Sequence, residues 1–314
     1  GAKDANKVAE IKQKLRSAFT ITDIGQIGTF IGIDCKRSCA GNFLTLSQER
    51  YIDTLVERFG CDQAKDSHRL PPVETIDFSG DKVDDTLPVR SLIGALLYIS
   101  KMTRPDVTAA VSYMSRYLDH PTPRVFKYCK QILKYLKTTK HSSLVLGDID
   151  GTSLVVYADA NFAPIGDRRS QSGAVFKLAG STVGWHRRKQ KTVSTSTTEA
   201  EYISLAIALN ENLWMQHLLE ELDYTVQYPT VMYEDNQPAI AIATNNRSPA
   251  LAKHISVKYH AIRDYQLKRY VDVRYIPTKS QLADGLTKVR AKSEDAHLLL
   301  GPQQCDTSQN QGEC

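Results

Sequence analysis

The sequence predicts an α/β protein whose main body is a mixed five-stranded sheet flanked by helices, preceded by an α+β part with a hairpin and several helices. Three observations indicate this. Runs of β-forming residues occur early in the second half of the chain, helices and strands then alternate, and the first half is mostly helical in pattern. Early strands followed by alternating helices and strands are typical of a mixed sheet covered by helices.

Length and composition limit the classes of protein to consider. The 314 residues are enough for two domains, and 41% hydrophobic with 24% charged residues is ordinary for a globular protein. The net charge of +5 is compatible with a polyanionic partner, but many soluble enzymes are equally basic. No signal peptide is visible in the sequence, and no apolar run approaches the length of a membrane span. Because the chain lacks an initiator Met, we expect it to be a piece of a longer protein.

The six cysteines do not predict a metal site. Cys35 and Cys39 lack a matching second pair, so a zinc site is not expected. Cysteines scattered in this way are typical of free thiols in a reducing compartment.

The first part of the chain predicts a helix, a hairpin and a second helix. Val8, Ile11 and Leu15 recur at helical spacing, which predicts a helix over 4–19. Strands are expected at 30–33 and 43–46, with Gly41-Asn42 as the hairpin turn between them. Ser47 is expected to cap a helix over 48–59, and residues 60–88 are expected to form a surface loop.

Three helices are then expected before residue 147. Arg104-Pro105 separates a helix over 90–102 from one over 105–118, and a third covers 125–136 with Ile132, Leu133 and Leu136 inward. The other face of the third helix carries Lys127, Lys130, Lys134 and Lys137. Such a face is either simply solvated or tracks phosphates, and the lysines alone favour the former.

After residue 150 the periodicity changes to that of a sheet with helices. We expect strands at 153–159, 173–178, 181–187, 230–234 and 271–276. We expect helices over 199–222, from about 238, over roughly 255–270, and near Leu282. Residues 291–314 are polar and Gln-rich, and a disordered tail is expected there.

Four acidic residues recur at the ends of these elements: Asp159, Glu201, Asp235 and Asp284. Each has a structural alternative. Glu201 fits a capping box that starts at Thr198, and either Asp235 or the next residue fits a helix cap. Asp284 would complement a helix dipole, and Asp159 would begin a turn.

Taken together, the four acids indicate a metal site. Asp159 and Asp235 close buried strands and the other two open helices, which gather at the same edge of a sheet. Like charges about 4 Å apart cost about 4 kcal/mol at an intermediate dielectric, and a divalent cation removes that cost. Oxygen ligands without nearby His or Cys favour Mg²⁺ or Mn²⁺. Two such ions about 3.5–4 Å apart would suit phosphodiester hydrolysis.

Several motifs resemble one family. They are Tyr157-Ala-Asp-Ala-Asn161, Ser196-Thr-Thr-Glu-Ala-Glu-Tyr202, Glu234-Asp-Asn-Gln237, Lys253-His-Ile255 and Gln281-Leu-Ala-Asp-Gly-Leu-Thr-Lys288. In order and spacing, over about 135 residues, they resemble the ribonuclease H domain of copia-type LTR-retrotransposon polyproteins. Upstream, Arg90-Ser-Leu-Ile-Gly-Ala-Leu-Leu-Tyr98 and Thr103-Arg-Pro-Asp106 resemble the end of the reverse transcriptase of that family.

The resemblance implies a domain plan and a reaction. Residues 1–147 would be the last palm hairpin and the thumb or connection of a reverse transcriptase, and 152–290 a ribonuclease H domain with a ribonuclease H-like fold. Asp159, Glu201, Asp235 and Asp284 would be its catalytic residues and the ligands of two Mg²⁺ or Mn²⁺ ions. The substrate would be the RNA strand of RNA–DNA hybrids. Nucleic-acid contacts are expected at ten positions: Lys127, Lys130, Lys134, Arg168, Arg169, Lys189, Lys191, Lys253, His254 and Lys258.

The sequence departs from the family pattern in two places. Cellular ribonucleases H carry a mobile catalytic histidine before the last aspartate, and the segment 276–282 has none. Reverse transcriptases use palm aspartates in a Tyr-x-Asp-Asp turn, which is absent here, so no DNA polymerisation is expected from this chain alone. A longer polyprotein would supply the missing fingers and palm as a partner.

Two other functions stay open. A truncated copy of the element would keep the fold and bind nucleic acid or a protein without cutting, and a nuclease for DNA junctions would use the same kind of fold. The parent element implies a cytoplasmic location in a virus-like particle, with the nucleus as the alternative.

Overall fold

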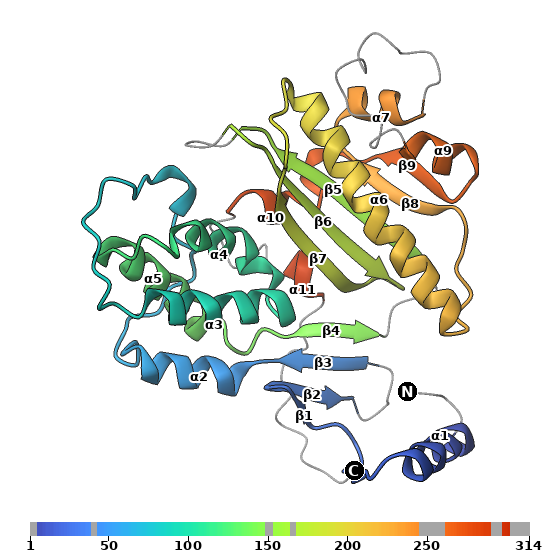
Figure 1. Cartoon of the computed structure of the whole chain (residues 1–314), viewed down its shortest axis with the longest axis horizontal. Helices are drawn as coiled ribbons and strands as arrows, with labels where there is room; N and C mark the ends of the chain where they lie inside the picture. The colour runs from blue at the N-terminus through green and yellow to red at the C-terminus, as the bar shows by residue number, and fades with distance from the viewer. Residues whose placement is uncertain are drawn as a thin grey trace.

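The protein folds around two β-sheets, each with its own helices (Figure 1). The fold is a computed structural model that describes residues 5–38, 43–147, 153–163, 168–244, 261–289 and 297–301. The boundary predicted near residues 147–152 lies between the two sheets, and residues 148–152 are outside the described residues.

The first sheet is antiparallel and four-stranded, in the order β1-β2-β3-β4. Its strands are β1 (Thr29–Phe30), β2 (Ile33–Arg37), β3 (Phe43–Ser47) and β4 (Leu144–Gly147). The single strand predicted over 30–33 is wrong, because Phe30 pairs with Ile33 and the chain reverses between them. The strand predicted over 43–46 is confirmed as β3, but its hairpin partner is β2, which begins at Ile33 where the predicted partner ends. The expected turn at Gly41-Asn42 lies outside the described residues.

Most of the helices before residue 147 pack into the first hydrophobic core. The helices of this part are α1 (Ala5–Ala18), α2 (Glu49–Arg58), α3 (Val89–Met102), α4 (Thr108–Met114) and α5 (Pro123–Thr138), with short 3₁₀ turns at Val73–Thr75, Pro105–Val107 and Ser115–Tyr117. Ile132, Leu133 and Leu136 of α5 are fully buried, as predicted. Ser47 is not a helix cap, because it ends β3 and the N-cap of α2 is Gln48, without a side-chain hydrogen bond.

The predicted surface loop 60–88 is anchored more firmly than its composition indicates. Val73 and Phe78 are both fully buried in the core formed by α2 to α5. Helix α1, in contrast, is less well packed than its sequence pattern predicts. Its position matches the prediction, but Ile11 and Leu15 are 54% and 44% exposed, so its apolar face does not join that core.

The second sheet confirms the predicted α/β class with a mixed five-stranded sheet flanked by helices. Its order is β7-β6-β5-β8-β9. The strands are β5 (Leu154–Asn161), β6 (Gln171–Leu178), β7 (Ser181–Lys189), β8 (Thr230–Glu234) and β9 (Val271–Tyr275). Strand β6 pairs antiparallel with both β5 and β7. Strand β8 pairs parallel with β5, and β9 pairs parallel with β8.

Helices cover both faces of this sheet (Figure 1). They are α6 (Thr197–Glu221), α7 (Gln237–Thr244), α9 (Ala261–Leu267) and α10 (Asp284–Thr287). Alternation along β5 and β6 separates the faces. Val156 and Phe176 pack with α6, whereas Val175 packs with Leu286 of α10 on the other face. The residues that the sequence predicts to be catalytic lie at one end of this sheet, close to the helices on its two faces.

Polar contacts join the half of the chain that forms the mixed sheet to the first half. Trp185 of β7 donates its indole N–H to the carbonyl of Ser100 at 2.8 Å, and Arg187 donates to the carbonyl of Ala109 at 3.1 Å. The carboxylate of Glu74 accepts from Arg187 at 3.3 Å and from the backbone N–H of Val289 at 3.0 Å. Arg187 is only 8% exposed, so its contacts with Ala109 and Glu74 are largely shielded from solvent.

The predicted disordered tail is wrong for part of its length. Residues His297–Leu300 form helix α11, and Leu299 and Leu300 are 4% and 1% exposed. Leu299 joins the small core of α10 and Val175, which attaches this short helix to the mixed sheet. Among the described residues, no helix combines the length and apolar character needed to cross a bilayer.

Candidate active site

Asp159 is placed by the central strand of the mixed sheet. Strand β5 has β6 on one side and β8 on the other, and Asp159 lies near its carboxyl end with 3% of its surface exposed. The hydroxyl of Ser204, from α6, donates to the carbonyl of Asp159 at 2.7 Å. The backbone of Asp159 is therefore held by the sheet and by the helix above it, and the alternative that Asp159 begins a turn is excluded.

Asp235 is brought next to Asp159 by strand register. Strands β5 and β8 run parallel with Tyr157 opposite Tyr233, so the two acids lie two residues further along neighbouring strands. The side chain of Asn236, not of Asp235, accepts the hydrogen bond of the helix cap from the N–H of Ala239 at 2.9 Å. The capping role that the sequence left open thus belongs to Asn236.

Glu201 lies in the second turn of α6, and capping does not explain it either. Ser196 is the N-cap and accepts from the N–H of Glu199 at 3.1 Å. The carboxylate of Glu199 reaches back to the N–H of Thr195 at 2.7 Å. This pair is a variant of the capping box in which Glu199 bonds the residue before the N-cap. Glu201, which is 5% exposed, takes no part in it.

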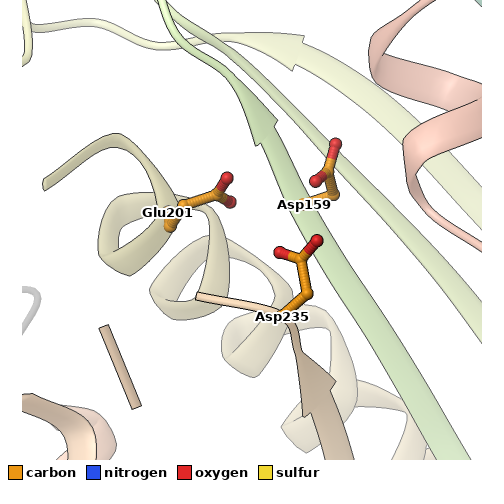
Figure 2. Close-up of side chains that lie close together, drawn as sticks. All are labelled: Asp159, Glu201 and Asp235. Carbon is orange, nitrogen blue, oxygen red and sulfur yellow. The ribbon is translucent and has the colours of Figure 1, made fainter. Parts of the chain in front are cut away.

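The three carboxylates converge. Each of Asp159, Glu201 and Asp235 offers an oxygen within 4.8 Å of the others, and Figure 2 shows them pointing toward one another from a strand, a helix and a strand end. Burial, followed by the nearby charges, raises the pKa of Asp159 to about 6, although a hydrogen bond from Thr287 opposes the shift. Burial and the charge of Glu234 raise the pKa of Glu201 far above its ordinary value.

Asp284 lies beside this group rather than within it. It begins α10, and its carboxylate accepts from the ammonium of Lys288 at 2.6 Å. Its charge nevertheless helps to raise the pKa of Asp159. Thr287, the residue before Lys288, also contacts the site. Its hydroxyl donates a hydrogen bond to Oδ2 of Asp159.

Glu234 is a further acid that the sequence reasoning missed. It is fully buried, and Oε1 accepts from the N–H of Asn236 at 3.0 Å. Burial raises its pKa well above the ordinary value, and the charges of Asp159 and Asp235 act in the same direction. Strand alternation was the signal that would have found it, since Glu234 shares the α6 face of β8 with the buried Met232.

The donor set fits a hard divalent cation. All three converging groups are carboxylates, and Oε2 of Glu201 is buried without a hydrogen-bond partner among the described residues. A buried carboxylate oxygen that no donor satisfies is costly unless a cation or a proton compensates it. Oxygen donors of this kind are the ligands that Mg²⁺ and Mn²⁺ prefer.

The basic residues predicted to contact nucleic acid are spread over several surfaces. On α5, Lys127 is exposed, while Lys130 and Lys134 are partly buried, with the Lys130 ammonium 5.6 Å from the ring centre of Phe126. Lys137 instead donates to the carbonyl of Asp62 at 2.7 Å. Four other predicted positions are exposed on the mixed sheet and its loops: Arg168, Arg169, Lys189 and Lys191. Lys253, His254 and Lys258 lie outside the described residues.

Comparison with known proteins gives extended matches to transposon polyproteins. The retrovirus-related Pol polyprotein from transposon TNT 1-94 of Nicotiana tabacum is 35% identical over 313 residues, which is 95% of this chain and 23% of that protein. The corresponding polyprotein from transposon RE1 of Arabidopsis thaliana is 35% identical over 279 residues, 87% of this chain and 19% of that protein. The chain thus spans about a fifth of the length of these relatives.

Solved structures match more weakly. The N-terminal RNase H domain of rv2228c from Mycobacterium tuberculosis, solved as a fusion with maltose binding protein, aligns over 44% of this chain and 91% of that chain. The sequence identity is 15% and the TM-score 0.32. No protein-family model matches the chain.

Proposed function

This chain belongs to the family of copia-type retrovirus-related Pol polyproteins from transposons, and we propose that it is a divalent-metal-dependent nuclease that cuts the RNA strand of RNA–DNA hybrids. The observation that carries the proposal is the convergence of Asp159, Glu201 and Asp235 at one edge of the mixed sheet. The substrate class follows from the resemblance of the motifs around these acids to the ribonuclease H domain of the family.

Asp159, Glu201 and Asp235 would hold the metal, and Asp284 would complete the set. A cation bound there supplies the positive charge that activates a water molecule and stabilises the leaving oxygen of a phosphodiester. The protein contributes fixed ligand positions, since Asp159 and Asp235 continue neighbouring parallel strands and Glu201 belongs to a long helix. Side chains on such rigid elements need little reorganisation when they bind a charged group.

The separation of roles among the acids supports a site rather than a chance cluster. Capping is done by Glu199 and Asn236, which leaves Glu201 and Asp235 directed at the third acid. Burying like charges without such a role would be unfavourable. Lys288, which pairs with Asp284, is a basic side chain beside these acids among the described residues.

Basic surfaces away from the acids would bind the RNA–DNA hybrid. Lys127, Lys130 and Lys134 on α5 belong to the first half of the chain, while Lys189 and Lys191 extend from the mixed sheet. Contacts to phosphates release counterions, so binding of a hybrid should weaken steeply between 50 and 200 mM salt, by about a thousandfold or more if six or more phosphates are engaged.

The test is cleavage of an end-labelled RNA–DNA hybrid by the full chain with Mg²⁺. We expect cleavage of the RNA strand, its loss in EDTA, and a fall of at least about 100-fold in Asp159→Asn, Glu201→Gln and Asp235→Asn. Glu211→Gln is the matched control, because Glu211 lies on the same helix as Glu201 but pairs with the exposed Arg188.

Two results would contradict the proposal. If the wild type binds the hybrid without cutting it at any Mg²⁺ or Mn²⁺ concentration, the chain is a binding remnant and not a nuclease. If it cuts a branched DNA junction and leaves the hybrid intact, the substrate class is wrong while the metal site stands.

A further inference from the structure

We propose that Thr287 is a positioning residue for the candidate metal site: its hydroxyl orients the carboxylate of Asp159, and Gly173 provides the space that lets it do so. This inference rests on the proposed function, because it concerns the same carboxylates. It assigns a role to two residues outside the acidic set.

The hydroxyl of Thr287 is directed at the acid from the face opposite α6. Thr287 ends α10, is fully buried, and donates its hydroxyl to Oδ2 of Asp159. The backbone of Asp159 is held separately by Ser204. With the main chain fixed and one carboxylate oxygen engaged, the rotation of the carboxylate is restricted, which is how residues around a metal ligand determine its orientation.

The segment that carries Thr287 is itself tied to the two strands bearing the acids. Gln281, only 1% exposed, donates its side-chain amide to the carbonyl of Ala158 at 2.9 Å and to that of Tyr233 at 3.4 Å. Asn161 donates to the carbonyl of Thr287 at 3.4 Å. Thr287 is therefore anchored on both sides by contacts to β5, and its position relative to Asp159 does not depend on a mobile loop.

Gly173 explains why α10 can come this close to the sheet. It is the register partner of Asp159 on β6. A Cβ at this position would lie 2.7 Å from Cγ2 of Thr287 and 3.2 Å from the carbonyl oxygen of Ala283. Contacts that short would force α10 outward, since one of the neighbours is backbone. The glycine thus acts here by close approach, because any side chain would move the threonine away from the acid.

A purely structural role for Thr287 predicts a different outcome. Its hydroxyl also lies 3.2 Å from the carbonyl of Asp284, so that hydrogen bond alone would satisfy a buried hydroxyl. If only helix stability were involved, removing the hydroxyl would lower stability without changing metal affinity. Metal affinity is therefore the readout that separates the two roles.

The experiment measures Mn²⁺ binding to the full chain by electron paramagnetic resonance of free Mn²⁺, together with thermal unfolding in EDTA. Thr287→Val keeps the shape but removes the hydroxyl, and we expect Mn²⁺ affinity to fall about 10–100-fold. Thr287→Ser keeps the hydroxyl and should bind within about threefold of the wild type. Gly173→Ala should weaken Mn²⁺ binding as well, because it displaces α10.

Thr230→Val is the matched control. Thr230 is a buried threonine of the same sheet whose hydroxyl accepts from Asn212 and Gln216 at 2.8 Å, at the opposite end of β8 from Asp235. It should lose stability and keep the wild-type Mn²⁺ affinity.

The possible results are distinguishable. Wild-type Mn²⁺ affinity in Thr287→Val would overturn the inference and leave the proposed function intact. If Thr287→Val does not fold, wild-type affinity in folded Gly173→Ala overturns it instead. Absence of Mn²⁺ binding by the wild type would overturn the proposed function and this inference with it.

Discussion

Replacing Asp159 by asparagine should stabilise the protein when no metal is present. Asp159 is 3% exposed, and burial raises its pKa from 3.8 to about 6. The folded protein therefore binds a proton at this position more tightly than the unfolded chain does. Between pH 3.8 and about 6 the unfolded state loses its proton first, so stability falls as the pH rises through that window and stays lowered above it.

The size of the effect follows from the same values. The difference between 3.8 and about 6, at about 1.4 kcal/mol per pH unit, corresponds to about 3 kcal/mol of destabilisation by the ionised carboxylate at pH 8. Asn keeps the shape and an oxygen that accepts from Thr287. We therefore expect Asp159→Asn to raise the free energy of unfolding by up to about 3 kcal/mol at pH 8 in EDTA and to leave it nearly unchanged at pH 4.

Urea unfolding at pH 4, 6 and 8, with EDTA and with 10 mM MgCl₂, measures both parts of this prediction. Metal bound only by the folded state stabilises it according to its concentration and affinity, so Mg²⁺ should stabilise the wild type and not the variant. A variant that is equally or less stable than the wild type at pH 8 in EDTA would refute the electrostatic reasoning. Glu211→Gln is the matched control for replacing a carboxylate by an amide, because Glu211 lies on α6 and pairs with the exposed Arg188.

Three further predictions concern the stability of the full chain, each measured by urea or thermal unfolding. Arg104→Ala should cost about 3–5 kcal/mol because it leaves Asp106 buried without its ion-pair partner, and a loss below 1 kcal/mol would contradict this. Ser196→Ala should cost about 1 kcal/mol by removing the cap of α6, whereas an unchanged midpoint would mean that the capping box is unimportant. Leu299→Ala should cost about 2–3 kcal/mol if α11 packs as described, and a neutral substitution would return this segment to the disordered tail expected from the sequence.

The elements that sequence reasoning located best are those with strong local periodicity. The five strands of the mixed sheet and the long helix α6 begin and end within a few residues of the predicted positions. Asp159 and Asp235 could be placed at one sheet edge because strand ends gather there in any sheet of this kind. The preference for Glu201 over Glu199 also agrees with the structure, since the capping box of α6 uses Glu199.

The elements that were missed depend on partners distant in sequence. Strand β4 has only four residues, and it is a strand because it pairs with β3, about one hundred residues earlier. Helix α11 packs through Leu299 against a core made by β6 and α10. Helix α1 was located correctly, but its apolar face at Ile11 and Leu15 is exposed, which a periodic pattern does not reveal. In each case packing against distant segments decides the outcome, and local sequence patterns do not encode it.

The same distinction applies within the site. The ligand types could be read from the sequence, whereas their supporting contacts could not. Glu234 was not predicted as a site residue. It adjoins Asp235 in the sequence, and strand alternation places its side chain on the face of β8 opposite to that of Asp235. The contact of Thr287 with Asp159 joins residues 128 positions apart and depends on a glycine in a third segment. Such contacts exist only after the sheet has formed.

The distribution of charge at the site links folding to metal binding. Burial raises the pKa of Asp159, Glu201 and Glu234, so the fold holds these acids in an environment that opposes their ionisation. Among the residues that the structure describes, the ammonium of Lys288 lies near them, and it is paired with Asp284. A divalent cation would compensate the charge of these buried carboxylates more completely than one ammonium does. Metal bound by the folded state would therefore offset at least part of the stability lost by burying the acids. The stability of Asp159→Asn measures the cost of the buried carboxylate, and the Mn²⁺ affinity of Thr287→Val measures how well that carboxylate is oriented to bind the ion.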